Sequence, residues 1–515
     1  MPGCVENLPG AGASRRARRL IVAALSALAV LGAAAPTAGA SAGQEAMFQD
    51  DLQLLYSGEH DREATLDTLK AIGVDSIRVF VSWNTIAPNP NSAARPGFNA
   101  SNPAAYPASG WDRYDELVRS ATRRGLSVVL TPTSPIPVWA SRCRGSIAVR
   151  RICSPDPTEF ARFATALGTR YSGRYTDEDG GGTLPRVSRW SVWNEPNVAI
   201  WLLPQYVRRG GRLIPVSAWR YRQLVYALVG GLRSTGHGGD QIMAGEMGPI
   251  GHSGGPLSHR AVATAEFLRT VFCLTPRGGP LHSASVGCTG RFAPMGISAI
   301  AHHPYIQGGS KPPRTPARFD EITISSPWRL RAIRNAAARL GRIRGGLPIY
   351  YTEFGFQTNP PDKILGVPLG LQAPFLDEAL YMSFRDPSVR GMAQYLLRDD
   401  PTLPGFQTGL EFSDGKPKPA LRDYAFPVFV ARRGVFVTVF GQVRVAPDGA
   451  RLPVQVQTRG AGARDFTTLK TVTTNDKGFV LVRLRSRRGT WRLVVPPSRG
   501  FATGLVSREA QEAIR

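Results

Sequence analysis

The sequence contains only five cysteines in 515 residues, and no two of them have the CxxC spacing that is typical of zinc sites. Cys4 lies in a segment that we expect to be removed. The other four form two local pairs in loop-like sequence, so we predict the disulfides Cys143–Cys153 and Cys273–Cys288 and an oxidising compartment. The Gly- and Asp-rich stretch 176–183 lacks an EF-hand pattern, which makes a calcium site unlikely and a solvated turn the better interpretation.

Long apolar runs are also missing beyond the N-terminus. Four arginines between Arg15 and Arg19 precede a short apolar run, Leu20–Gly32, and the small residues Ala38–Ala40. This order is typical of a signal peptide, which we place at residues 1–40. No later stretch approaches the roughly 20 apolar residues that a membrane helix needs. We therefore expect a secreted protein with no integral membrane span after cleavage, with an uncleaved anchor as the alternative.

Acidic residues are few relative to basic ones, 38 against 63, so the formal net charge is +25. The arginines are scattered and do not form one basic, aromatic-rich block, so a nucleic-acid partner is not favoured. A solvated basic surface and an affinity for anionic cell-wall polymers both fit the charge. The composition, 42% hydrophobic and 20% charged, excludes a disordered chain. We find no internal repeat of the length that builds solenoids.

Two strand-like stretches each end in a glutamate. The stretch 187–197, VSRWSVWNEPN, begins with branched and aromatic residues and must stop at Pro196, which cannot donate a ladder hydrogen bond. The stretch 347–356, LPIYYTEFGF, ends in the same way around Glu353. Glu195 alone could be an ordinary turn residue. Two carboxylates at the carboxyl ends of buried strands are, however, the acid and the nucleophile that a glycoside hydrolase needs.

These motifs resemble those of the clan A retaining glycoside hydrolases, the cellulase-like superfamily. In that clan an Asn-Glu-Pro at the end of strand 4 carries the acid/base, and a glutamate at the end of strand 7 carries the nucleophile. The resemblance implies that Glu195 is the acid/base and Glu353 the nucleophile. Residues 131–133 read Thr-Pro-Thr where cellulase-type members often have a histidine, so the family within the clan is left open.

The resemblance implies a (β/α)8 barrel of the α/β class, which we place at residues 44–426. A Val- and Thr-rich segment of alternating pattern, 428–497, predicts a small all-β sandwich of six or seven strands. It would be either a glycan- or wall-binding module or a structural appendage. We expect a frayed helix in the tail, 498–515. The eight barrel strands are predicted at Met47–Asp51, Asp75–Trp83, Leu126–Pro132, from Val187, Gln241–Gly245, Met295–Ala301, from Leu347, and Val389–Leu397.

Further residues are candidates for supporting roles. By resemblance, Arg78 would brace Glu353, Asn194 would hold a sugar hydroxyl, and His303 and Tyr305 would stand behind the nucleophile. Adjacent histidines at 302 and 303 suggest a metal, but successive strand residues face opposite ways and we expect no nearby carboxylate to complete a site. The remaining candidates are Tyr395 as a substitute for the clan's sugar-floor tryptophan, Trp83 near the substrate, Glu246 as a reserve catalytic carboxylate, and Trp201, Tyr206 and Trp219 as sugar platforms.

The predicted function is an exported retaining O-glycoside hydrolase that cleaves a β-glycosidic bond in a carbohydrate, with no metal or organic cofactor. The two carboxyl groups should lie about 5–5.5 Å apart. Glu195 should have a raised pKa and Glu353 a lowered one. The alternatives are a transglycosylase that uses the same site and a catalytically silent glycan- or cell-wall-binding protein.

Overall fold

The computed structural model describes residues 40–251, 256–403, 405–486, 488–498 and 504–514. Residues Ser41–Arg515 form one compact unit. The predicted signal peptide lies outside the described residues except for Ala40. No helix within the described ranges has both the length and the hydropathy to cross a membrane. Both predicted disulfides, Cys143–Cys153 and Cys273–Cys288, are confirmed.

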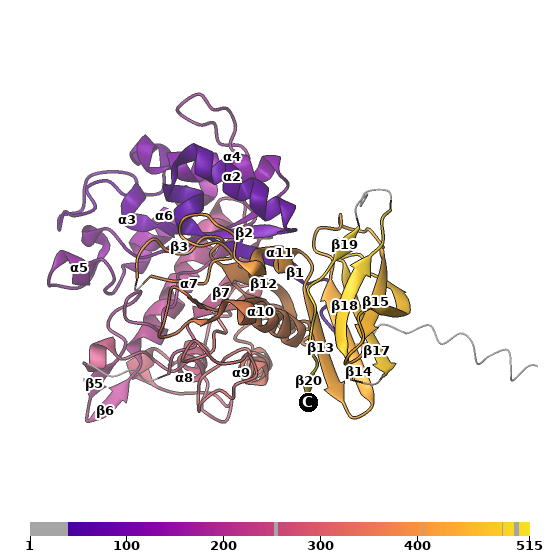
Figure 1. Ribbon diagram of the computed structural model, residues 1–515. Coiled ribbons are helices and arrows are strands. Elements are labelled where there is room, and N and C mark those ends of the chain that lie inside the picture. Colours follow the sequence, from indigo (N-terminus) through magenta and orange to yellow (C-terminus); the bar gives the residue numbers. More distant parts are fainter. Residues whose placement is uncertain (1–39, 252–255, 404, 487, 499–503, 515) are drawn as a thin grey trace, which may run out of the picture. The chain divides into compact units, whose positions relative to one another are not determined.

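Eight parallel strands close into a barrel, in which each strand pairs with the next and the last pairs with the first (Figure 1). Every strand overlaps a predicted one, so the predicted fold class is confirmed. The strands are, in spatial order, β1 (Glu45–Gln49), β2 (Ser76–Ser82), β3 (Ser127–Thr133), β4 (Arg189–Ser191), β7 (Gln241–Met247), β8 (Ala299–His302), β9 (Ile349–Tyr351) and β12 (Val389–Tyr395).

The barrel interior is filled by side chains that alternate with outward-facing ones along the strands. Those that form the interior cluster are Met47, Val129, Met243, Ala299, Ala301, Tyr350 and Ala393, all buried. Because the strands are parallel, their carboxyl ends meet at one rim, where the loops that carry Glu195 and Glu353 begin. A barrel of this kind places its functional residues at that rim.

Helices separate the barrel strands along the chain. The principal ones are α2 (Gly58–Ala71), α4 (Asp112–Arg123), α6 (Pro157–Arg170), α7 (Val216–Ser234), α8 (Thr264–Val271), α9 (Pro327–Arg339), α10 (Leu369–Phe384) and α11 (Pro419–Ala425). Two single-turn helices, α3 (Trp83–Ile86) and α5 (Ile147–Arg150), lie in loops. Helix α10 contains Pro374 near its beginning, which removes one hydrogen bond without ending the helix.

Two short strand pairs lie in the loops, and neither was predicted. One is the antiparallel hairpin of β5 (Val207–Arg209) and β6 (Arg212–Ile214). The other joins β10 (Thr358–Asn359) to β11 (Val367–Pro368). Strands of two or three residues carry too little periodicity to stand out in a sequence.

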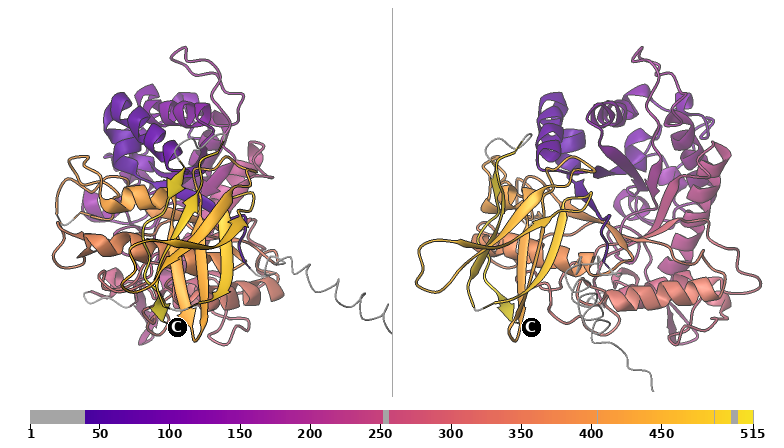
Figure 2. Two further views of the ribbon diagram at one scale, coloured as in Figure 1. Left: turned by 45° about the vertical axis from the view of Figure 1, so that its right-hand side comes forward. Right: turned by 90° about the vertical axis from the view of Figure 1, so that its right-hand side faces the viewer.

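The C-terminal segment forms two four-stranded sheets, with the orders β17-β14-β13-β20 and β16-β15-β18-β19 (Figures 1 and 2). Valines alternate toward the space between the sheets, where they surround the fully buried Trp491. The predicted sandwich is therefore present, with eight strands. Their bounds are β13 (Val428–Arg433), β14 (Phe436–Gln442), β15 (Pro453–Arg459), β16 (Thr467–Thr473), β17 (Phe479–Arg485), β18 (Thr490–Val495), β19 (Leu505–Val506) and β20 (Ala513–Ile514).

The predicted helix in the tail is wrong for the residues that the structure describes there. Strand β19 pairs with β18, and β20 adds to β13 as a parallel edge strand. Ala510 is buried and exchanges two backbone hydrogen bonds with Trp491. The tail completes both sheets because these edges of β13 and β18 offer unpaired backbone groups, which no local pattern reveals.

The sandwich packs against α10 through aromatic rings. Tyr381 lies 5.0 Å from Phe429 between ring centroids, and Phe384 lies 4.9 Å from both Phe440 and Phe479. The Lys477 ammonium adds an ion pair of 3.2 Å to Asp75 on the barrel. These contacts hold the sandwich against the barrel, which both of the roles that the sequence left open would allow.

Candidate active site

The chain turns sharply where Glu195 leaves strand β4. Trp193 and Glu195 have φ angles of +66° and +35°, which L-residues adopt rarely. Pro196 follows and cannot extend the ladder. Strained backbone of this kind gathers at functional sites, where the surrounding packing holds it. The turn therefore directs the Glu195 side chain across the rim of the barrel.

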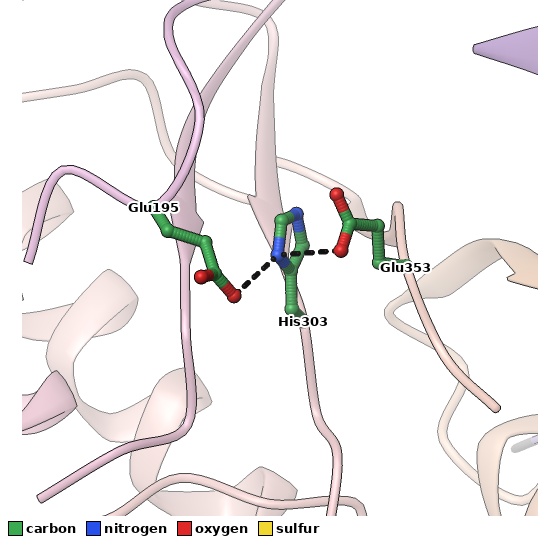
Figure 3. A group of neighbouring side chains, drawn as sticks. All are labelled: Glu195, His303 and Glu353. Atoms are coloured by element: carbon green, nitrogen blue, oxygen red, sulfur yellow. Dashed lines mark hydrogen bonds and ion pairs between the residues drawn. The ribbon is translucent and has the colours of Figure 1, made fainter. Parts of the chain in front are cut away.

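Glu195 and Glu353 face each other across the site, with His303 between them (Figure 3). The His303 Nδ1 atom lies 3.1 Å from Glu195 Oε1 and 3.4 Å from Glu353 Oε2. The three atoms through which this group could bind one ion all lie within 4.8 Å of one another. The structure thus brings together two carboxylates that the sequence separates by three β/α units.

Arg78 lies beneath this pair and is fully buried. Its guanidinium donates to Glu353 Oε1 at 2.8 Å and to Asn194 Oδ1 at 2.9 Å, and it also bonds the Gln49 side chain. A second ion pair joins it to Glu246 at 3.1 Å. The bracing contact between Arg78 and Glu353 is therefore present, and the contact with Glu246 is one that the sequence did not suggest.

Glu246 is fully buried behind the pair, so it does not reach the substrate space as a third catalytic carboxylate would. It accepts hydrogen bonds from His303 Nε2 at 2.7 Å, from Thr352 Oγ1 at 2.6 Å and from the Ser191 hydroxyl. Burial alone would raise the pKa of Glu246, but Arg78, His303 and Ser191 outweigh burial and lower the pKa to about 2. Glu246 is therefore a permanent anion that holds the two cations in place.

His303 carries a positive charge at neutral pH. Burial by itself would lower its pKa, but Glu353, Glu195 and Glu246 outweigh burial and raise the pKa to about 9. Its neighbour His302 points elsewhere and bonds the Ile322 carbonyl at 2.8 Å, and burial lowers its pKa to about 3. Tyr305 donates a long hydrogen bond of 3.4 Å to Glu353 Oε2. Tyr305 thus contacts Glu353, whereas His303 lies between the two glutamates and contacts both.

Burial raises the pKa of Glu353, against the lowering effects of His303 and Arg78. The neighbouring charges of Glu195 and Glu246 raise it further. The predicted lowered pKa of Glu353 is therefore wrong for the unliganded site.

The charges of this cluster balance when the pair holds one proton. Arg78 and His303 supply two positive charges, and Glu246 and one carboxylate of the pair supply two negative ones. A second ionised carboxylate would leave an excess buried negative charge, which is costly in a medium of low polarity. This balance explains physically why burial and the neighbouring carboxylates together raise the pKa of Glu353.

A cavity of about 260 Å³ opens above the two glutamates. Asn194, Tyr305, Tyr395 and Trp201 line it, so four of the predicted binding residues reach the substrate space. The Asn194 Oδ1 atom is occupied by Arg78, which leaves the Nδ2 group to face the cavity. An amide donor in this position suits a sugar hydroxyl.

Three predicted binding residues lie elsewhere. Trp83 is fully buried and stacks on Phe163 at 5.3 Å, so it is part of the core between the barrel and its helices. Tyr206 is buried and donates to Glu266, and Trp219 packs against the Cys273–Cys288 disulfide cluster. Aromatic residues beside a catalytic loop are more often packing residues, and their sequence positions do not distinguish the two roles.

Glu195, His303 and Glu353 could in principle hold a metal ion, and they are the one such group in the ranges that the structure describes. The expectation that no carboxylate lies near His303 is therefore wrong. A protonated imidazole has no lone pair to offer, however, so an ion would first have to displace the proton that His303 holds because the surrounding carboxylates raise its pKa to about 9. The side chains of Glu195, His303 and Glu353 are therefore better suited to holding a proton than to binding a metal ion.

No family model and no curated protein matches the sequence. Among solved structures, the chain is similar to a family 39 glycoside hydrolase from Bacteroides cellulosilyticus WH2, with a TM-score of 0.50 and 15% identity over 88% of this chain and 81% of the other. It also matches GH5_18 from Streptomyces cattleya in complex with GlcNAc (TM-score 0.45, 16% identity, 74% and 79% coverage) and a monomeric β-xylosidase from Caulobacter crescentus CB15 (0.45, 14%, 87% and 95%).

The chain shares its fold with the family 39 glycoside hydrolase, and its closed eight-stranded barrel is the fold that the resemblance implied. At such low identity the similarity establishes the fold alone. The catalytic assignment therefore depends on the residues of the site.

Proposed function

We propose that the chain is a retaining glycoside hydrolase in which Glu195 is the acid/base and Glu353 the nucleophile. The observation that carries this proposal is the spacing of the two carboxylates, whose facing oxygens lie within 4.8 Å at the floor of the cavity. Retaining enzymes place these groups about 5–5.5 Å apart, whereas inverting enzymes leave about 6.5–9.5 Å for a water molecule. The spacing supports double displacement.

In the first step Glu353 attacks the anomeric carbon while Glu195 donates its proton to the glycosidic oxygen. The bond from the anomeric carbon to that oxygen breaks, and an alcohol leaves. In the second step Glu195 takes a proton from water, which attacks the anomeric carbon and releases Glu353. The pair carries one negative charge before and after each step, so Arg78 and His303 face a constant charge throughout. Such a preorganised site needs little rearrangement during the reaction.

The substrate in this proposal is a β-linked glycoside, and the enzyme acts outside the cell. Two disulfides and the charged, apolar and small-residue order of the N-terminus support export. Release from a secretion host, with N-terminal sequencing of the exported protein, tests this part of the proposal.

Azide rescue tests the two catalytic assignments separately. With an activated aryl β-glycoside, Glu195→Ala should form the covalent intermediate and accept azide, which gives a β-glycosyl azide. Glu353→Ala cannot form that intermediate, so azide should attack directly and give the α-glycosyl azide. Product anomers are read by NMR. Each variant should lose at least about 10³-fold in kcat without azide, because a catalytic carboxylate contributes a large share of the acceleration.

Glu59→Ala, an exposed glutamate on α2, is the matched control and should keep full activity. Circular dichroism checks that each variant folds. If wild type binds sugars but hydrolyses none of a panel of aryl glycosides and polysaccharides, the protein is a silent binder and the proposal fails. A sugar product joined to an added alcohol, in place of the free sugar, identifies a transglycosylase.

A further inference from the structure

The mouth of the cavity is lined by exposed apolar side chains, several of them aliphatic. Ile200, Leu365 and Phe406 are 68%, 39% and 49% exposed and line the cavity together with Ile250 and Ile306. Large apolar side chains gathered around one opening are uncommon on a free surface and usually mark a binding site.

Part of this apolar lining lies on the side of Glu195. Ile200 and Trp201 belong to the loop that carries Glu195 out of β4. The loop after β7, which contains Ile250, is tied to it by the Asn197 side chain, which bonds both the N–H and the carbonyl of Gly248 at 2.9 and 3.0 Å. The general acid protonates the leaving oxygen, so groups around Glu195 contact the leaving group.

The described lining of the cavity offers no positive charge that would hold an acidic leaving group. Among its described lining residues the only charged ones are Glu195 and Glu353, although 20% of the chain is charged. Two of the polar groups that line it are engaged with the protein, since Thr408 Oγ1 donates to the Tyr395 carbonyl and Gln357 Oε1 accepts from the Gln407 N–H. A phosphate, sulfate or uronate would therefore find no cation among these residues.

A second sugar would also be poorly served on this side. Sugars stack on flat aromatic faces and need partners for their hydroxyl groups, since an unpaired buried hydroxyl is costly. Trp201 offers one such face, but the branched aliphatic side chains of Ile200 and Ile250 on the same side offer neither a flat face nor a hydrogen bond. They do match a hydrocarbon, because burial of apolar surface on both partners is favourable.

We propose that the leaving group of the natural substrate is a hydrocarbon-rich alcohol of at least six carbons, attached to a neutral sugar. The inference rests on the proposed function and specifies its substrate class. Glu195 gives its proton to the glycosidic oxygen, the bond to the anomeric carbon breaks, and the free alcohol departs along the wall of Ile200, Trp201 and Ile250. Water then releases the sugar from Glu353, so that one water molecule is consumed for each bond cleaved.

A series of alkyl glycosides tests the inference. The alcohols from methanol to dodecanol differ little in acidity, so differences in kcat/KM along the series report contacts of the chain. Methyl, hexyl, octyl and dodecyl β-glucosides, galactosides, mannosides and xylosides are compared below their micelle concentrations. Full burial would give about fourfold per methylene. At an open mouth we expect roughly twofold per methylene, hence about a hundredfold over the seven methylenes from methyl to octyl, with a plateau at longer chains.

Single substitutions identify which side chains cause the chain-length preference. Ile200→Ser and Ile250→Ser should each lower the octyl-to-methyl ratio of kcat/KM by about threefold or more, chiefly through the KM of the octyl substrate. Ile147→Ser, at an isoleucine that is 47% exposed and does not line the cavity, should leave the ratio unchanged. Equal losses in all three variants would overturn the assignment of this wall.

The outcomes separate the inference from the function on which it rests. Hydrolysis with no chain-length preference, or faster hydrolysis of oligosaccharides, overturns the inference and leaves the glycosidase intact. If no glycoside is cleaved, calorimetry with octyl and methyl β-glucoside still decides, because tenfold tighter binding of the octyl compound supports the apolar subsite and equal binding overturns it. Glucosylceramide in phosphatidylcholine vesicles, compared with soluble octyl glucoside, distinguishes a membrane glycolipid from a soluble glycoside as the source.

Discussion

Replacing His303 by glutamine should remove a stabilising charge that depends on pH in a defined direction. The His303 ring is fully buried and lies between three carboxylates, and these raise its pKa from 6.5 to about 9. The difference of roughly 2.5 pKa units corresponds to about 3 kcal/mol of folding free energy, at 1.36 kcal/mol per unit. Because the pKa is higher in the folded state, this stability is fully present below pH 6.5 and is lost as the pH rises through 9.

The assay is urea denaturation of the wild type and His303→Gln between pH 6.5 and 9.5. Asp50, whose pKa burial raises to about 7, also titrates near the start of this range, so the quantity to compare is the difference in unfolding free energy between the two proteins. His302 stays neutral throughout, since burial lowers its pKa to about 3. We expect the variant to be less stable at pH 6.5 and the difference to shrink by about 3 kcal/mol toward pH 9.5.

His60→Gln, at an exposed histidine on α2, is the control and should give no such pH-dependent difference. In the wild type, kcat/KM should also fall on the alkaline side with an apparent pKa near 9, because a neutral His303 leaves an excess negative charge beside Glu195 and Glu353. A difference in stability that is the same at pH 6.5 and 9.5 would refute the imidazolium and with it the charge balance of the site.

Other predictions concern stability and the roles of single residues. Arg78→Met should cost about 3–5 kcal/mol in thermal or urea unfolding, because it leaves two buried carboxylates without their cation, and a loss below 1 kcal/mol would contradict this. Trp83→Ala should cost about 3–5 kcal/mol with KM little changed, since this ring is core; a raised KM with unchanged stability would restore its binding role. Reduction of the disulfides should cost about 2–3 kcal/mol each on the chain-entropy model, measured as a lowered urea midpoint, and single Cys143→Ser and Cys273→Ser variants assign the losses.

The sequence by itself determined the features that depend on residues close together along the chain. Alternating or continuous apolar runs placed all eight barrel strands, although β4 ends at Ser191, ahead of the predicted stop at Pro196. Short loops made the two disulfide pairings evident, and the alternation of valines and turn residues revealed the sandwich. Each of these signals extends over about ten residues, so it can be recognised in the sequence without knowledge of the tertiary structure.

The tertiary structure decided which of these elements meet and in what environment. Arg78 lies 275 residues from Glu353, and no local pattern shows that Glu246 and His303 complete the same buried charge cluster. The tail became two sheet edges because distant strands offered unpaired backbone groups. Trp83 became core because the rings of Trp139, Phe160 and Phe163 pack around it. Burial and charge are sums over everything that packs around a group, so the pKa of Glu353 and the apolar mouth of the cavity emerge only when the barrel has closed.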